Sequence, residues 1–129
     1  MLDHIGFAVA DLMRAQAFYD TALAPLGIGA LLSFSAEQTG SGDQVGYGSN
    51  DKAYFWIGTG GAPLSGRLHV AFVAPDRETV DAFYAAAMSA DGRDNGAPGV
   101  RAHYHPDYYG AFVLDPDGHN VEAVCHAPG

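Results

Sequence analysis

YYGAFVLDPDGHNVEAV, residues 108–124, contains two apolar runs separated by a turn signal. Asp115 to Gly118 places proline second and glycine fourth, as a type I turn prefers, so the flanking runs are predicted to pair as a β-hairpin. Glu122 then falls among the apolar residues of the second strand. Because an unpaired carboxylate is costly there, we expect Glu122 to have a partner: a cation, a basic side chain or a metal ion.

Composition indicates one globular domain and excludes some partners. The chain has 129 residues, of which 48% are hydrophobic, so we expect a single domain over residues 1–129. Fifteen Asp and Glu against six Lys and Arg give a formal charge of −9, which argues against binding nucleic acid or an anionic membrane by charge. The same charge is compatible with a cationic or metal-bearing partner, or simply with solubility.

The single cysteine, Cys125, excludes an internal disulfide and is compatible with a reducing compartment. No basic region followed by an apolar run opens the chain, and no segment approaches the length of a membrane span. We therefore expect a cytoplasmic protein.

The first half is predicted to contain one helix and four strands. Residues 2–10 alternate as a strand, and Asp11 is a good N-cap for a helix over residues 12–24. Further strands are expected near three segments: 28–35, 44–48 and 53–58.

The second half repeats the first with a shift of 65 residues. From His4 to Leu23, seven of twenty positions are identical to those from His69 to Met88, whereas about one is expected by chance. The chain is therefore predicted to be two βαβββ modules, over about residues 1–62 and 66–127. The matched positions include the histidines, the helix caps and the Phe-Tyr pairs.

In the second module we predict a strand from Arg67 to Val73, a helix from Arg77 to Ser89 and a polar loop from Asp91 to Gly99. The last strands are expected at residues 100–104, 109–114 and 119–125. A shift of 66 residues near the module ends places Trp56 opposite Glu122.

The repeat makes His4 and His69 informative. Ile5, Phe7 and Val9 form the bulky face of the first strand, so His4 is predicted to point away from the helices, as is His69 in the fifth strand. For a lone strand histidine the alternative is a hydrogen bond to a nearby carbonyl. Two imidazoles with the Glu122 carboxylate on one concave face would instead form a set that holds a divalent metal ion and leaves open coordination positions.

The doubled plan, the openings DHIGFAVAD and LHVAFVAPD, and the ending DPDGHNVEAV resemble the vicinal oxygen chelate superfamily. This group includes glyoxalase I, fosfomycin resistance proteins, bleomycin resistance proteins and extradiol dioxygenases. The resemblance implies an α+β fold in which two tandem βαβββ modules form a curved, eight-stranded half-barrel cleft.

The resemblance also implies a site. The family's metal ligands match His4, His69 and Glu122, which would hold Fe, Mn, Zn or Ni. Trp56 matches the position where glyoxalases carry a further metal ligand. Phe112 matches the position where extradiol enzymes carry an acid-base tyrosine. Neither reaction is therefore assigned, although a metal with two open positions would act as a Lewis acid on neighbouring substrate oxygens.

Several aromatic and imidazole side chains are candidates for the surroundings of such a metal. His103, His105 and Tyr108 are candidate proton carriers because they cluster in HYHPDYY, although an aromatic loop or interface patch is the alternative. His119 and His126 are predicted to lie on the surface. The expected cleft residues are Tyr47, Trp56, Tyr104 and Tyr109.

Two functions follow. The first is a metal-dependent, glyoxalase- or dioxygenase-like enzyme acting on a small oxygen-rich molecule. The second is a metal-free protein, similar to bleomycin resistance proteins, that binds a cationic small molecule in an acidic cleft. The resemblance implies a homodimer in which the modules pair within or between chains, so that the ligands of a site come from one subunit or from both, and exposed sheet edges also favour a partner.

Overall fold

The computed structural model describes residues 1–63 and 68–129. The fold is α+β with two βαβββ modules, as predicted. Each module has its own four-stranded sheet, in which the strands of the module lie in the order first, fourth, third, second, and no strand pairing joins the two sheets in the described ranges. Within each sheet, the first and last strands of the module run parallel.

The first module follows the predicted order closely. Two short helical turns that the sequence did not predict, η1 and α2, flank its second strand. The elements are β1 (Ile5–Ala8), α1 (Leu12–Ala22), η1 (Ala24–Leu26), β2 (Gly29–Phe34), α2 (Ala36–Thr39), β3 (Gln44–Ser49) and β4 (Lys52–Gly58).

The second module contains β5 (His69–Val73), α3 (Arg77–Ser89), β6 (Arg93–Val100), β7 (Tyr109–Leu114) and β8 (Asn120–Cys125). The second module was predicted to begin near residue 66 and its first strand at Arg67. Both positions lie outside the described residues. The predicted hairpin is confirmed, since β7 and β8 pair antiparallel across Asp115–Gly118.

The sixth strand corrects the prediction. Residues 91–99 were expected to form a loop, but they contain most of β6. The strand was expected at residues 100–104, but most of that segment belongs to the turns over residues 102–107. Since β6 is an edge strand, it tolerates Pro98, and its pairing with β7 shifts register around Gly96. Glycine and proline therefore mark an irregular edge strand here.

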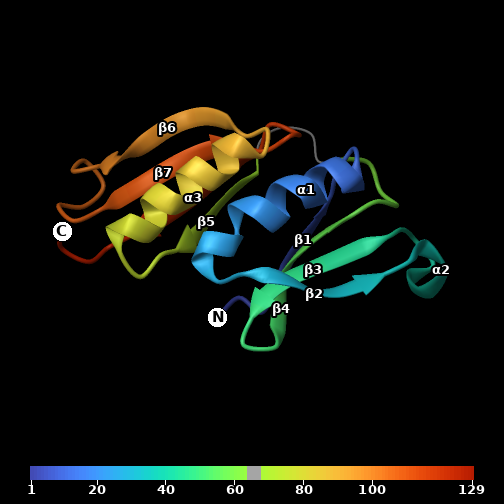
Figure 1. Cartoon of the computed structure of the whole chain (residues 1–129). Helices are drawn as coiled ribbons and strands as arrows, with labels where there is room; N and C mark the ends of the chain where they lie inside the picture. The colour runs from blue at the N-terminus through green and yellow to red at the C-terminus, as the bar shows by residue number, and fades with distance from the viewer. Residues whose placement is uncertain (64–67) are drawn as a thin grey trace.

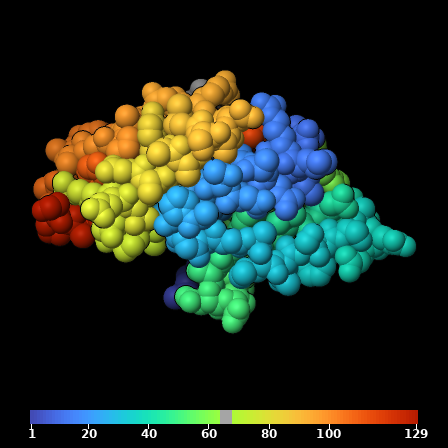
Figure 2. Space-filling view, in the orientation of Figure 1, coloured from blue at the N-terminus to red at the C-terminus, as the bar shows by residue number. Residues whose placement is uncertain are grey.

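The two long helices begin at equivalent caps and pack together. The side chain of Asp11 accepts a hydrogen bond from the Arg14 backbone, and that of Asp76 accepts one from Thr79. Figure 1 shows α1 and α3 side by side, and in Figure 2 their blue and yellow surfaces meet on the face shown. None of the helices in the described ranges has the length and apolar character that a bilayer crossing needs.

A single cluster of buried apolar residues extends through both modules. Phe18 and Phe83, which the repeat aligns, are both fully buried. Phe55 of β4 packs edge-on against Phe72 of β5, with ring centroids 5.3 Å apart. Burial of each such ring contributes about 1.5–3 kcal/mol, so the modules stabilise each other.

The turn between β7 and β8 also ties the modules together. The Tyr19 hydroxyl of α1 donates to the buried carboxylate of Asp115 at 2.5 Å, and the backbone N–H groups of Asp117 and His119 donate to the other oxygen of Asp115. The backbone N–H of Ala10 donates to Asp117. Donors of the first module therefore form hydrogen bonds with the carboxylates in the turn of the second module.

Replacing Tyr19 with phenylalanine should lower the free energy of unfolding by about 1–3 kcal/mol, because the buried Asp115 carboxylate loses a donor. Urea unfolding measures the change. Tyr84→Phe is the matched control, since its hydroxyl binds Asp94 at the surface and its loss should change stability little. Equal effects of the two substitutions would contradict this role of the Tyr19 bond.

Candidate functional site

Glu122 lies on the outer face of its sheet, which is the face opposite the helices. Its neighbours in β8, Val121 and Ala123, belong to the core. Glu122 pairs with Ala71 of β5 on one side and with Phe112 of β7 on the other. The strand alternation therefore brings a carboxylate with no exposed surface to the centre of this face.

The Glu122 carboxylate has two side-chain partners. Its Oε1 lies 2.8 Å from Nε2 of His69, and its Oε2 accepts a hydrogen bond from the Tyr108 hydroxyl. Within the described part of the chain, no Lys or Arg forms an ion pair with Glu122. The expectation that this buried acid has a partner is confirmed, and the partners are an imidazole and a phenol.

The environment keeps Tyr108 in its neutral form. Burial is the main cause that raises the pKa of Tyr108 above its usual value, and the hydrogen bond to the Glu122 carboxylate and its charge raise it further. Tyr108 is therefore a hydrogen-bond donor at neutral pH and not a phenolate base.

Gly110 is a site residue that sequence reasoning missed. A Cβ atom at this position would lie 3.1 Å from the Tyr108 ring and 3.2 Å from Oε2 of Glu122. The missing side chain therefore makes room for the hydrogen bond between the two. A glycine inside an otherwise apolar strand was the available signal, because it marks close approach of another group.

His4 points to a different set of groups. Its Nδ1 lies 2.6 Å from the carboxylate of Asp3, which also accepts a bond from Lys52 at 3.0 Å. In residues 1–63 and 68–129, no three His, Cys, Asp or Glu side chains form a group that could hold a metal ion. One chain thus brings together His69 and Glu122 but leaves His4 apart from them.

The chemistry of the His69 and Glu122 pair suits a divalent ion, because an imidazole nitrogen and a carboxylate oxygen are both zinc ligands. Nε2 of His69 and Oε1 of Glu122 lie 2.8 Å apart, which is a hydrogen-bond distance. Two ligand atoms of a tetrahedral zinc ion at about 2.1 Å lie roughly 3.4 Å apart, so the pair would open by about 0.6 Å to hold one. The side chain of His69 is half exposed, whereas that of Glu122 is buried.

Trp56 occupies the equivalent place in the first module. It pairs with Gly6 in the parallel ladder of β1 and β4, as Glu122 pairs with Ala71 in β5 and β8. The indole lies over Gly46, where a Cβ would meet the ring at 2.7 Å, and runs parallel to the ring of Phe34. The first module therefore presents an aromatic surface where the second presents an acid.

Two of the predicted cleft tyrosines point toward the helices instead. Tyr47 is fully buried in the core, where its hydroxyl donates to Asp20 of α1 at 2.8 Å. Tyr109 packs under the guanidinium of Arg77 and donates to Asp81 of α3. The strand alternation explains both placements, because the outer positions beside them belong to glycines or to Tyr108.

The HYHPDYY segment forms the turn between β6 and β7. Tyr104 is exposed, and its ring lies 5.0 Å from that of Tyr108 and 4.1 Å from that of His103. His105 accepts a hydrogen bond from the backbone of Asp107. Neither histidine of this turn is hydrogen-bonded to Glu122 among the side chains described, so only Tyr108 of the three candidates contacts the acid.

His119 and His126 were both predicted to lie on the surface, and the structure confirms this for one of them. His126 is exposed, as predicted. The prediction for His119 is wrong: it is buried, because its turn folds onto the first module. Its Nδ1 accepts the backbone N–H of Leu68, and its ring packs edge-on against Phe7.

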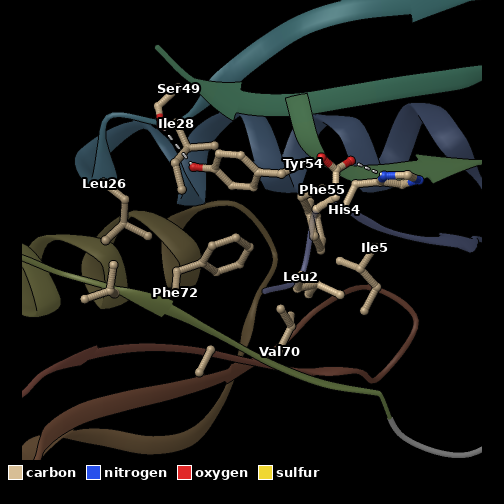
Figure 3. A pocket seen from close by; sticks show the side chains of 13 residues that line it. Leu2, His4, Ile5, Leu26, Ile28, Ser49, Tyr54, Phe55, Val70 and Phe72 are labelled. Atoms are coloured by element: carbon tan, nitrogen blue, oxygen red, sulfur yellow. Dashed lines mark hydrogen bonds and ion pairs between the residues drawn. The ribbon is translucent and has the colours of Figure 1, made fainter. Parts of the chain in front are cut away.

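A hollow of about 380 Å³ opens at the seam between the modules. Figure 3 shows His4 at one end of it and the hydroxyls of Tyr54 and Ser49 at the other, with Phe55 and Phe72 between. His69 and Glu122 do not line this hollow. It is therefore separate from the acid–imidazole pair within one chain.

The family model for the Glyoxalase/Bleomycin resistance protein/Dioxygenase superfamily matches residues 1–123. A comparison with curated proteins finds no significant match. Among solved structures, a glyoxalase/bleomycin resistance protein from Albidiferax ferrireducens T118 is 31% identical, with a TM-score of 0.77 over 97% of this chain and 98% of that one.

Two more distant structures share the fold. Glyoxalase I from Zea mays is 18% identical, with a TM-score of 0.75 over 99% of this chain and 45% of that one. The fosfomycin resistance protein FosX from Listeria monocytogenes, solved with Mn(II) and sulfate, is 19% identical, with a TM-score of 0.68 over 97% and 91% of the two chains. The family model over residues 1–123 and the 31% identical structure establish that the chain belongs to the glyoxalase/bleomycin resistance protein/dioxygenase superfamily.

Proposed function

We propose that this protein is a metal-dependent enzyme that binds a small molecule through neighbouring oxygen atoms. The observation that carries the proposal is the fully buried Glu122 carboxylate with Nε2 of His69 at 2.8 Å and no Lys or Arg ion pair in the described chain. A divalent cation would compensate the buried charge without displacing either side chain far. The fosfomycin resistance protein FosX, which shares the fold, was solved with Mn(II), and this adds to the support.

His69 and Glu122 would hold the ion, and Tyr108 would keep Glu122 in place. A divalent ion supplies Lewis acidity, which stabilises negative charge on substrate oxygens. The Tyr108 hydroxyl remains protonated near neutral pH, so in this site it binds and orients as a hydrogen-bond donor.

The third ligand in this proposal is His4, supplied by a second copy of the chain. His4 and the His69–Glu122 pair lie in different modules and do not form one group in the described chain. A twofold dimer would make two equivalent sites, each with the pair from one subunit and the partner subunit's His4.

Exposed apolar side chains support a partner copy. β2 is an edge strand that is exposed along its whole length, and the N-terminus and β5 also expose large apolar groups. Such surfaces favour association with a second copy, because association removes their apolar area from water. The exposed apolar residues on these segments are Met1, Leu2, Leu31, Leu32, Phe34 and Val73.

A metal-free binding protein is the second candidate. It is favoured by the lack of a three-ligand group in the described part of one chain and by the parallel rings of Phe34 and Trp56, whose planes differ by 11°. Aromatic faces attract cations, and the chain carries a formal charge of −9. In this alternative the cleft would bind a cationic small molecule.

Elemental analysis of the purified protein separates the two candidates. After incubation with Fe, Mn, Zn or Ni salts and desalting, the wild type should retain about one metal ion per chain, and His69→Ala should retain little, because one of few ligands is gone. His103→Ala is the matched control and should retain the wild-type amount. A wild type without bound metal after every incubation would select the binding protein.

Mixing two defective variants tests the shared site. His4→Ala and His69→Ala should each lose metal as homodimers, whereas their heterodimer should recover about one ion per dimer, since one of its two sites has every ligand. Co-expression with two different affinity tags isolates the heterodimer, and light scattering gives its mass. A monomeric wild type, or a heterodimer without metal, would refute the shared arrangement.

A further inference from the structure

The two carboxylate oxygens of Glu122 have different partners. Oε2 is occupied by the Tyr108 hydrogen bond, whereas Oε1 faces Nε2 of His69 at 2.8 Å. Because the carboxylate is fully buried, water does not compete for either oxygen. The side chain of Glu122 is therefore held with one oxygen directed toward His69.

The surrounding fold holds Tyr108 in turn. The backbone N–H of Arg101 donates to the carbonyl of Tyr108 at 2.7 Å, which closes the turn between β6 and β7. The ring packs against Tyr104 and His126, with centroids 5.0 and 5.2 Å away. Gly110 leaves the space that the ring and Oε2 occupy.

We propose that Tyr108 is a positioning residue, whose hydrogen bond to Oε2 leaves only Oε1 of Glu122 to bind a divalent ion beside His69. This inference rests on the proposed metal function. It also specifies how the acid binds, through one oxygen and in a fixed direction. Partners of ligating side chains commonly change metal affinity about 10- to 100-fold when they are removed.

Tyr108→Phe should therefore weaken metal binding about 10- to 100-fold, because Glu122 loses the bond that orients it while the aromatic ring remains. Tyr104→Phe is the matched control: it removes a hydroxyl from the same turn, at an exposed side chain that makes no hydrogen bond to Glu122 in the described structure. Calorimetric titration of Zn²⁺ and Mn²⁺ into chelator-stripped protein measures the affinities. Circular dichroism checks that both variants fold.

A second readout needs no metal. In the stripped wild type, a hydroxyl proton held between Tyr108 and Glu122 should exchange slowly enough to give its own NMR resonance, which should persist in Tyr104→Phe and vanish in Tyr108→Phe. Its absence from the wild type would overturn the inference.

The titrations distinguish two kinds of failure. Wild-type affinity in a folded Tyr108→Phe protein, or an equal loss in Tyr104→Phe, would overturn the positioning role and leave the metal function standing. A wild type that binds neither ion would overturn the metal function, and the inference with it.

Discussion

The buried carboxylate of Glu122 imposes the strictest requirement on the second module. A charge removed from water must be matched by hydrogen bonds or by opposite charge, or the strand that carries it is destabilised. Three features meet this requirement: an imidazole from the parallel neighbour β5, a phenol from the turn before β7, and a glycine that makes room for the phenol beside the carboxylate. The geometry of the site thus follows from the need to keep one acid inside the sheet.

The two modules carry chemically different side chains at equivalent positions. Both parallel ladders have the same register, so Trp56 and Glu122 occupy matching rungs beside Gly6 and Ala71. The first module fills this place with an indole that lies over Gly46 and so needs no polar partner. The acid and its imidazole therefore belong to one module, and a complete ligand set would require a second surface.

The sequence predicted features that depend on local pattern. The repeat located both helix caps, the separation of the strand histidines from the helices, and the equivalence of Trp56 with Glu122. It did not locate β6, because the glycine and proline that usually interrupt a strand are tolerated at an irregular edge. Such a strand depends on its neighbour for its hydrogen bonds, and no local signal reveals that neighbour.

The side-chain partners were harder to predict because they depend on strand parity and on contacts between modules. Tyr108 and Tyr109 are adjacent, yet one binds Glu122 and the other binds Asp81 of α3. Likewise, the burial of His119 follows from the docking of its turn onto Phe7, which lies more than a hundred residues earlier. A one-residue change in register would reverse such assignments.

The most direct measurement of the central claim is anomalous diffraction from crystals of the protein loaded with Mn²⁺. The proposed arrangement predicts one strong peak within bonding distance of Nε2 of His69 and a single oxygen of Glu122, with the partner subunit's His4 as the third ligand. A peak elsewhere, or none at the His69–Glu122 pair in crystals that contain manganese, would contradict it.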